Sequence, residues 1–221
     1  NGSITVKKGT TGVNLIFDNL SLTSTKTAPL TINKDGAEVK LRLEGTNTLI
    51  DNENPENEFS TDPVVLDLFE ASAIKIKSKS SLTISGNGTL NVESINKNAI
   101  KGGKQATIQI NSGTINIIST KNGLSCDHKI IINGGTINIS ALSEGIKLEP
   151  DADDAVSAAE LTINGGTINA GTPLNKIGDD GIQAIGNIYI NGKANINVYA
   201  ENDAIQTKSN FYMTDGTLNL Y

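Results

Sequence analysis

Short runs in which apolar and polar residues alternate recur along most of the chain, and they predict strands. In Leu161–Ile163 and Thr167–Ala170 every second side chain is apolar, which is the spacing of a strand with one buried face. Similar runs nearer the start predict further strands at Val13–Phe17, Leu20–Leu22, Pro29–Ile32 and Val39–Leu43. No segment carries a convincing apolar stripe at the helical period of about 3.6 residues. The pattern therefore predicts an all-β chain without crossover helices.

The alternating runs belong to an internal repeat. Ile132–Ile139 (INGGTINI) returns as Ile163–Ala170 (INGGTINA), and looser copies occupy Ile110–Ile117 and Met213–Leu220. The Asn-Gly-Gly between two runs supplies the positive-φ positions of a tight corner. Each repeat is therefore expected to hold several short strands joined by corners.

A second motif, a polar residue followed by Gly or Ala and then Ile or Leu, precedes each copy. Its six occurrences begin at Ser72, Asn98, Asn122, Glu144, Asp180 and Asp203. Successive occurrences are 22–26 residues apart, with one interval of 36. Such a unit cannot bury its apolar face alone, whereas stacked coils bury a continuous column. We expect one domain over residues 1–221, a single-stranded parallel β-helix (β-solenoid). A β-sandwich is the alternative, although it does not require one residue type to recur in register.

Two polar stretches interrupt the repeat. The acidic stretch Asp51–Pro63 (DNENPENEFSTDP) contains two prolines and predicts a loop that projects from the stack. The long interval contains Glu149–Glu160 (EPDADDAVSAAE), where a short helical turn is expected through Ala155–Ala159.

Charge and composition narrow the possible partners. The chain has a formal net charge of −6, 4% aromatic residues and no Trp, which argues against nucleic-acid binding through phosphates. No apolar run approaches the roughly 20 residues of a membrane-spanning helix. We expect the protein to be a monomer. The single cysteine, Cys126, excludes an internal disulfide. It is expected to point into the core, and His128 is expected to lie in a turn.

Carboxylates gather on the later coils, at and beside the polar position of the second motif. Neighbouring coils lie about 4.8 Å apart, where like charges repel unless a cation neutralises them. Calcium takes six to eight oxygen ligands, and Gln183 and Gln206 would add amide oxygens. The candidate ligands are Glu144, Asp179, Asp180, Asn202, Asp203, Asp127 and Glu149 on the coils, and Asp151, Asp153 and Asp154 in the insertion.

Other interpretations of these polar residues stay open. The acidic column is alternatively a solvated edge, the insertion an acidic flap, and the neutral Asn98 and Asn122 a hydrogen-bonded amide ladder. The first projecting stretch holds a third acidic cluster, a weaker calcium candidate, at Asp51, Glu53, Glu56 and Glu58.

Four residues are candidates for sugar contacts. Tyr189 and Tyr212 are expected to face outward in one column of adjacent coils, as a sugar platform or as a pair that stabilises the strands. Lys147 and Lys208 are candidates for contacts with sugar carboxylates. Without Trp, a wide flat platform for crystalline cellulose is unfavourable.

Four segments carry a family resemblance: Gly12–Asp18, Asn47–Leu49, Glu144–Lys147 and Gly178–Ala184. Their order resembles that of secreted bacterial β-helix proteins that bind cellulose and acidic sugars and are similar to family-9 pectate lyases. The resemblance covers nearly the whole chain. It implies a right-handed parallel β-helix, bound Ca²⁺, polysaccharide as the partner, and secretion or display on the bacterial cell surface.

The calcium ligands of the lyase relatives carry over onto Glu144, Asp179 and Asp180, whereas Gln183 stands where the lyases have another Asp. We therefore expect calcium-dependent, non-catalytic binding of plant cell-wall polysaccharide, with acidic sugars such as polygalacturonate favoured and cellulose as a further ligand. One alternative is a calcium-dependent pectate-type lyase with Lys147 or Lys208 as the base. The other is a structural or adhesive cell-surface β-helix.

Overall fold

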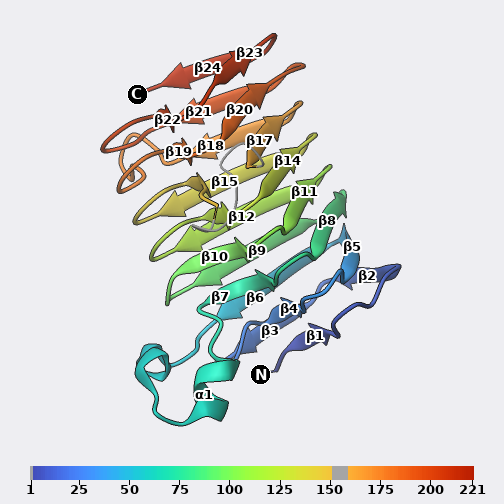
Figure 1. Ribbon diagram of the computed structural model, residues 1–221. Coiled ribbons are helices and arrows are strands. Elements are labelled where there is room, and N and C mark those ends of the chain that lie inside the picture. Colours follow the sequence, from blue (N-terminus) through green and yellow to red (C-terminus); the bar gives the residue numbers. More distant parts are fainter. Residues whose placement is uncertain (1, 151–158) are drawn as a thin grey trace.

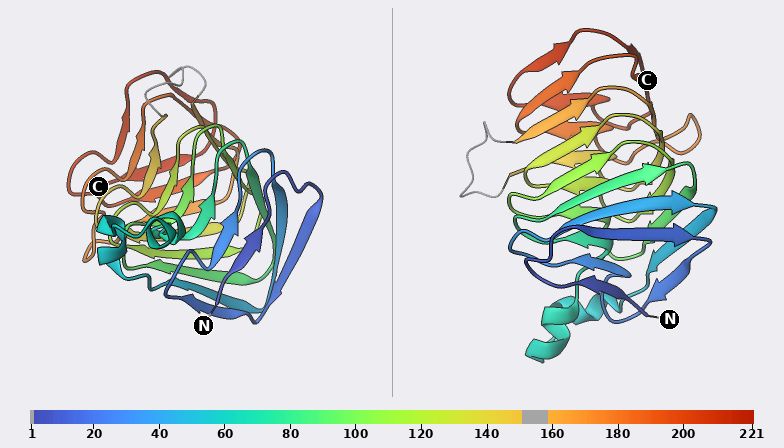
Figure 2. Two further views of the ribbon diagram at one scale, coloured as in Figure 1. Left: turned by 60° about the horizontal axis from the view of Figure 1, so that its bottom comes forward. Right: turned by 90° about the vertical axis from the view of Figure 1, so that its right-hand side faces the viewer.

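The computed structural model describes residues 2–150 and 159–221, and its strands form three parallel sheets (Figure 1). Each sheet has eight strands, and the chain visits the three sheets in turn on every coil. The predicted all-β parallel β-solenoid is confirmed. The two termini lie at opposite ends of the stack (Figure 1). The oblique view on the left of Figure 2 shows strands of the coils surrounding the interior.

We call the sheets A, B and C in the order in which the chain first enters them. Sheet A consists of β1 (Ile4–Val6), β4 (Leu30–Ile32), β7 (Ser72–Ile76), β10 (Asn98–Gly102), β13 (Leu124–Cys126), β16 (Ile146–Leu148), β19 (Ile182–Ala184) and β22 (Ile205–Thr207). Sheet B consists of β2 (Val13–Asp18), β5 (Glu38–Glu44), β8 (Ser81–Gly86), β11 (Thr107–Ile110), β14 (Lys129–Ile132), β17 (Glu160–Ile163), β20 (Asn187–Ile190) and β23 (Phe211–Met213). Sheet C consists of β3 (Ser21–Ser24), β6 (Thr46–Asp51), β9 (Thr89–Ser94), β12 (Thr114–Ser119), β15 (Thr136–Ala141), β18 (Thr167–Ala170), β21 (Asn195–Val198) and β24 (Thr217–Leu220).

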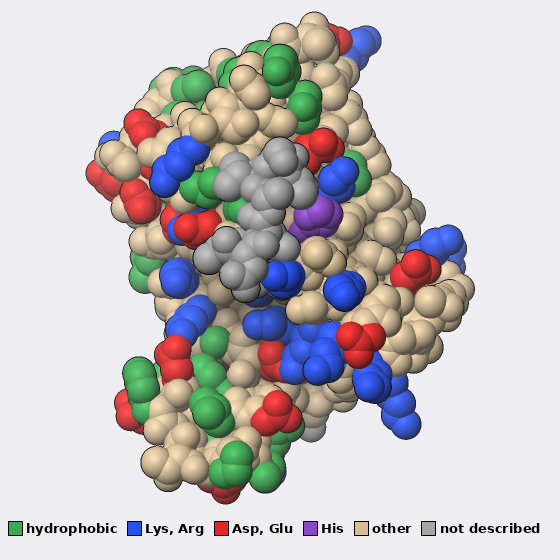
Figure 3. Space-filling model, in the orientation of Figure 1, with side chains coloured by type: hydrophobic (Ala, Val, Ile, Leu, Met, Phe, Trp, Pro, Cys, Tyr) green, Lys and Arg blue, Asp and Glu red, His purple; other side chains and the backbone are tan. Residues whose placement is uncertain are grey.

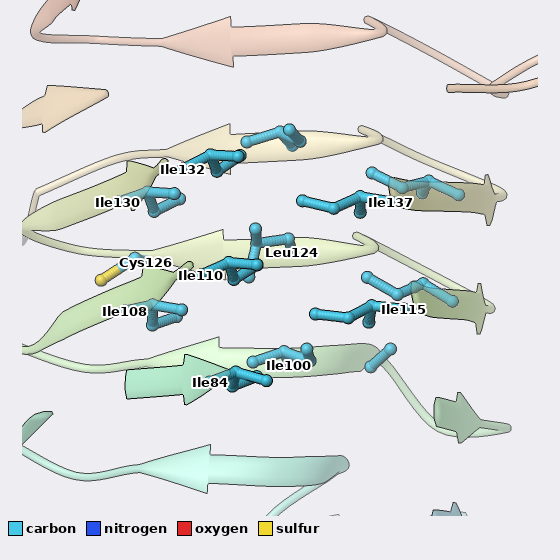
Figure 4. Close-up of a cluster of buried hydrophobic side chains, with 14 of the residues drawn as sticks. Ile84, Ile100, Ile108, Ile110, Ile115, Leu124, Cys126, Ile130, Ile132 and Ile137 are labelled. Atoms are coloured by element: carbon cyan, nitrogen blue, oxygen red, sulfur yellow. The ribbon is translucent and has the colours of Figure 1, made fainter. Parts of the chain in front are cut away.

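The core is one column of aliphatic side chains that runs through the stack. Strand register places Ile100 beside Leu124 and Ile146 beside Ile182, so the apolar position of the second motif repeats from coil to coil. Figure 4 shows these side chains converging from all three sheets, with Cys126 among them as predicted. Each fully buried Ile or Leu stabilises the fold by about 1.5–3 kcal/mol.

The corners between sheets B and C follow the predicted glycine chemistry. Gly135 and Gly166, each the second glycine of its pair, have φ of 89° and 88°. A Cβ on Gly134, the first glycine, would stand 2.8 Å from the carbonyl oxygen of Asn111 on the preceding coil. The corner therefore needs one glycine for its backbone angle and the other for close packing.

Amide ladders are present, but on other residues than predicted. Asn122 Oδ1 accepts the backbone N–H of Glu144 at 3.4 Å, and Asn98 Oδ1 has no hydrogen-bond partner among the described residues. No side-chain hydrogen bond joins Asn98 to Asn122 within the described residues, so the amide-ladder interpretation is wrong for these two positions. The ladders run along sheet C and along the B–C corners instead.

The first projecting stretch, predicted as a loop, contains the short helical segment η1 (Pro55–Phe59), and the helix α1 (Pro63–Leu68) begins at its last residue. Both segments extend away from the stack beside the N-terminal coils (Figures 1 and 2). The side chains of Asn54 and Asp62 cap them, each followed by the proline that begins the segment. A cap residue before proline is a helix-start signal. The helical turn expected in the second insertion lies outside the described residues, apart from Ala159. No helix in the described parts of the chain has the length and apolar content to span a bilayer.

Candidate functional site

The outward positions of sheet A form a ladder rich in lysine. Strand register aligns Lys75, Lys101, Ser125, Lys147 and Gln183 on five successive coils. The residues on either side of each rung are buried, so strand alternation turns these side chains outward. The sequence repeat thus places three ammonium groups on one face.

A groove of about 580 Å³ lies over the middle of this ladder. We call it the lysine groove, and it is lined by Asn98, Lys101, Lys121, Asn122, Ser125, Asp127, Lys147, Glu149 and Pro150. Figure 3 shows Lys and Arg side chains gathered across the middle of one face of the molecule, although the whole chain is acidic. The charged residues of the lining are three lysines and two carboxylates, so the groove keeps a small excess of positive charge on an acidic protein.

Carboxylates hold two of the groove lysines in place. Lys147 Nζ lies 2.6 Å from Glu144 Oε1 and 3.0 Å from Glu149 Oε2. Burial alone would lower the pKa of Lys147, but hydrogen bonds to these two carboxylates raise it above its ordinary value. Lys101 forms an ion pair with Asp127 and lies 3.4 Å from Ser125 Oγ. These ammonium groups are therefore positioned before any ligand arrives.

Lys75 extends the ladder beside the first projecting stretch. Its Nζ lies 3.7 Å from Glu70 Oε2, and Lys77 pairs with the same carboxylate. Burial lowers the pKa of Lys75, an effect that the Glu70 charge opposes and the nearby Lys101 and Lys77 charges reinforce. The pKa of Lys75 is thus shifted in the opposite direction to that of Lys147.

The predicted acidic column exists, and the protein's own donors occupy its two buried carboxylates. Glu144 accepts hydrogen bonds from Lys147 and from the Ser143 hydroxyl. The pKa of Glu144 is lowered, because these hydrogen bonds outweigh a burial effect that would raise it. Asp180 Oδ2 accepts from Gln183 Nε2 at 2.7 Å, and its Oδ1 accepts from Asn202 Nδ2 at 3.0 Å and from the N–H of Asp203 at 3.1 Å.

Calcium takes six to eight oxygen ligands, and in this structure the oxygens of Glu144 and Asp180 accept hydrogen bonds from the protein. In the described parts of the chain, no three His, Cys, Asp or Glu residues are grouped closely enough to hold a metal. Asp127 and Glu149 lie in the lysine groove as partners of Lys101 and Lys147. The predicted ligands Asp151, Asp153 and Asp154 lie outside the described residues.

The predicted sugar contacts are divided between two faces. Tyr189 and Tyr212 stack as predicted, with ring centroids 5.1 Å apart and an interplanar angle of 8°. They stand on β20 and β23 of sheet B, whereas Lys147 stands on β16 of sheet A. Lys208 follows β22 and is exposed. The structure therefore does not bring these four residues into one site.

Three lysines of this face were not predicted as site residues: Lys75, Lys101 and Lys121. A signal for the first two was present, because Ile-Lys follows the small residue of the second motif at Ile74-Lys75 and Ile100-Lys101, as it does at Ile146-Lys147. Residues that follow the buried position by one are outward by strand alternation. The lysine ladder is therefore visible in the sequence at the position directly after the buried Ile or Leu of the second motif.

Comparisons with known proteins identify a family and a similar solved structure. The family described as carbohydrate-binding domain-containing protein matches residues 1–194. The solved structure of the polysaccharide lyase-like protein from C. thermocellum, a gadolinium derivative, is similar to this chain at 26% identity and a TM-score of 0.74. The match covers 94% of this chain and 77% of that one. No curated protein matches. A family match over most of the chain, on a fold shared with a polysaccharide lyase-like protein, is sufficient for assignment: the chain belongs to the carbohydrate-binding domain-containing protein family.

Proposed function

We propose that the chain binds acidic polysaccharide, such as polygalacturonate, in the lysine groove. The observation that carries the proposal is the coil-to-coil alignment of Lys75, Lys101 and Lys147 beside a groove that Lys121 also lines. A polyuronate presents carboxylates at regular intervals, and the ladder presents ammonium groups at coil-spaced positions, with Ser125 between Lys101 and Lys147. The family match supports a polysaccharide as the ligand, and the acidic-sugar class rests on the lysines.

In this proposal the sugar is bound by N–H donors of the lysines that do not take part in ion pairs. An ammonium group has three N–H donors. Lys147 directs two of them at Glu144 and Glu149, which leaves a third for a ligand. Lys121 is exposed and lines the groove, and no ion pair is described for it within residues 2–150 and 159–221. A sugar carboxylate therefore meets one unpaired and two positioned cations.

Calcium dependence stays a prediction. Calcium at the acidic column would have to displace Lys147 from Glu144, or Gln183 and Asn202 from Asp180. The lysine groove offers direct contacts that need no bridging metal. Similarity to family-9 pectate lyases, secretion and a monomeric state likewise remain predictions.

Calorimetric titration of metal-stripped protein with oligogalacturonate tests the proposal. We expect binding in the presence of a chelator that weakens as salt rises, because screening shortens the reach of the lysine charges. Replacing Lys101 and Lys147 together by Gln should lower the affinity at least tenfold, about 1.4 kcal/mol. Lys40→Gln is the matched control, since Lys40 is an exposed outward lysine on β5 of sheet B. Unchanged affinity in the folded double variant would exclude this site, and binding that appears only with added Ca²⁺ would favour the bridging mechanism.

Lyase activity is a second candidate, favoured by the lowered pKa of Lys75. In this reaction a neutral amine takes the proton from C5 of a uronate, the C4–O bond breaks, a C4–C5 double bond forms, and the departing chain end takes up a proton. Lys147 is poorly suited as the base, because its two carboxylate partners keep it protonated. The absorbance of unsaturated uronides, followed with polygalacturonate with and without Ca²⁺, should rise steadily if the chain is a lyase. That rise should disappear in Lys75→Gln and persist in Lys40→Gln.

A further inference from the structure

A second groove lies on a different face of the solenoid, over sheet C. It has a volume of about 600 Å³. It is lined by Asn116, Ile117, Ile118, Asn138, Ile139, Ser140, Asn169, Gly171, Thr172, Pro173, Asn197 and Tyr199. None of these residues carries a charge, and none lines the lysine groove. We call it the amide groove.

A ladder of asparagine side chains forms its floor. The Nδ2 groups of Asn138, Asn169 and Asn197 each donate to the Oδ1 of the asparagine one coil earlier, at 2.8 Å. Asn116 continues the ladder to Asn91, also at 2.8 Å. A primary amide has two N–H donors and two acceptor positions. Each rung therefore keeps one donor and one acceptor beyond the ladder itself.

The segment between β18 and β19 forms one wall of the amide groove. The N–H of Gly171 donates to the carbonyl of Ile139 at 2.9 Å and ties the start of the segment to the neighbouring coil. Gly171 has a φ of 73°, and a Cβ there would stand 2.3 Å from the carbonyl oxygen of Tyr199. Thr172 and Asn175 close a turn through two hydrogen bonds, at 2.8 and 3.0 Å. The wall is thus held by backbone contacts.

Apolar surface accompanies the amides. Ile118 is 56% exposed although it is a large aliphatic residue on a strand. Pro173 contributes a rigid apolar ring to the wall. Tyr199 lines the groove, and its ring stacks on Tyr221 with centroids 4.3 Å apart. A pyranose ring has hydroxyls at its rim and C–H groups on its faces, so it matches a surface that combines amides with apolar and aromatic groups.

We infer that the amide groove binds a neutral, hydroxyl-rich glycan chain lying along the solenoid axis across the asparagine rungs. A hydroxyl both donates and accepts, so it pairs with the donor and acceptor that each rung keeps. An uncharged lining gives no advantage to an acidic sugar. This inference is independent of the proposed function of the lysine groove, because the two grooves share no residue.

Titration of the chain with cellohexaose, xylohexaose and mannohexaose, followed by calorimetry, tests the inference. We expect at least one of these neutral hexasaccharides to bind, with an affinity that is unchanged between about 0.05 and 0.5 M salt, where the Debye length falls several-fold. Ser140→Trp fills the groove from an exposed position without removing a ladder bond, and should reduce the affinity at least tenfold. Ile16→Trp, at an exposed outward position of β2 on sheet B, is the matched control and should bind as the wild type does.

A second variant separates recognition from packing. Asn138→Thr combined with Asn169→Thr removes two rungs while keeping β-favouring residues on the strands, and it should lose binding even where its melting temperature is close to that of the wild type. The Lys101→Gln, Lys147→Gln double variant should bind the neutral glycan normally and lose only the acidic one. Absence of binding by all three hexasaccharides, or full binding by Ser140→Trp, would overturn the inference. Loss of neutral binding in the lysine variant would also overturn it and assign both ligands to the lysine groove.

Discussion

Lys147 Nζ lies 2.6 Å from Glu144 Oε1, so the cation of the groove and the first carboxylate of the acidic column form one unit. The side chains are 18% and 5% exposed, so water screens the pair only weakly. The pKa of Glu144 is lowered and that of Lys147 is raised, and hydrogen bonds between the two contribute to both shifts. The carboxylate predicted to hold calcium therefore acts in this structure as a support for a groove lysine.

Glu144→Gln tests this pairing. We expect the free energy of unfolding at pH 7 to fall by about 2 kcal/mol, because Lys147 loses a partly buried partner. The lowered pKa of Glu144 means that its contribution is present above about pH 4.5 and is lost as the pH falls through the folded-state pKa. The difference between wild type and variant in urea unfolding should therefore shrink as the pH falls below the folded-state pKa of Glu144. Glu44→Gln, in an exposed pair with Arg42, should change stability by less than about 0.5 kcal/mol at either pH.

Glu53, at the base of the first projecting stretch, predicts a different pH dependence of folding stability. It is fully buried, and its carboxylate accepts the N–H groups of Glu70 and Ala71. Burial raises the pKa of Glu53 to about 8, helped by the nearby charge of Asp51 and opposed by the backbone hydrogen bonds. The folded state thus holds a proton that the unfolded chain releases near pH 4.5. The contribution of Glu53 to stability is therefore greatest at low pH and declines as the pH rises from about 4.5 to 8.

Thermal unfolding at pH 5 and pH 8.5 checks this decline. The wild-type melting temperature should be several degrees lower at the higher pH, and Glu53→Gln should reduce that difference because Gln does not ionise. Glu56→Gln, on the surface of η1, serves as the control and should keep the wild-type difference. An unchanged difference in Glu53→Gln would show that another group carries the pH dependence.

The coils were predictable because one physical requirement repeats in them. Every coil must bury an Ile or Leu at the same place, so residues such as Ile100, Leu124 and Ile146 mark the register directly in the sequence. The corners were predictable because few residues other than glycine adopt the φ of Gly135. The α1 helix was not predicted, since six residues are too few to show a helical stripe. Its cap and proline, Asp62 and Pro63, were the available signal.

The site was less predictable because its chemistry depends on side-chain partners across coils. The sequence places Asp180 in the acidic column, and that placement is confirmed by the backbone bond from Gly145. It does not show that Gln183 and Asn202 direct their amides at that carboxylate. That choice depends on rotamers and on the register across the 36-residue interval. The lysine ladder, in contrast, depends only on strand alternation.

Cys126 should be unreactive in the folded protein. The residue is fully buried, and burial raises the pKa of its thiol to about 11. The thiolate is the reactive form, so neither access nor ionisation favours modification at pH 7.5. A thiol-specific chromogenic reagent should label less than a tenth of the protein under native conditions and all of it in denaturant. Rapid native labelling would mean that the A–B corner opens often.

Gly145→Ala should destabilise the stack at the point where the lysine groove meets the acidic column. An added Cβ would stand 2.5 Å from the carbonyl oxygen of Gly181 on the next coil, a backbone atom that cannot rotate away. The same carbonyl accepts the N–H of Ile146 at 3.0 Å, so movement of one coil disturbs the ladder bond of the other. We expect a loss of about 2–3 kcal/mol in urea unfolding. Gly2→Ala, whose Cβ would meet only Leu22 at 3.9 Å, should stay within about 0.5 kcal/mol of the wild type. Equal stability of the two variants would mean that the coils separate there at little cost, and that the groove tolerates changes in coil spacing.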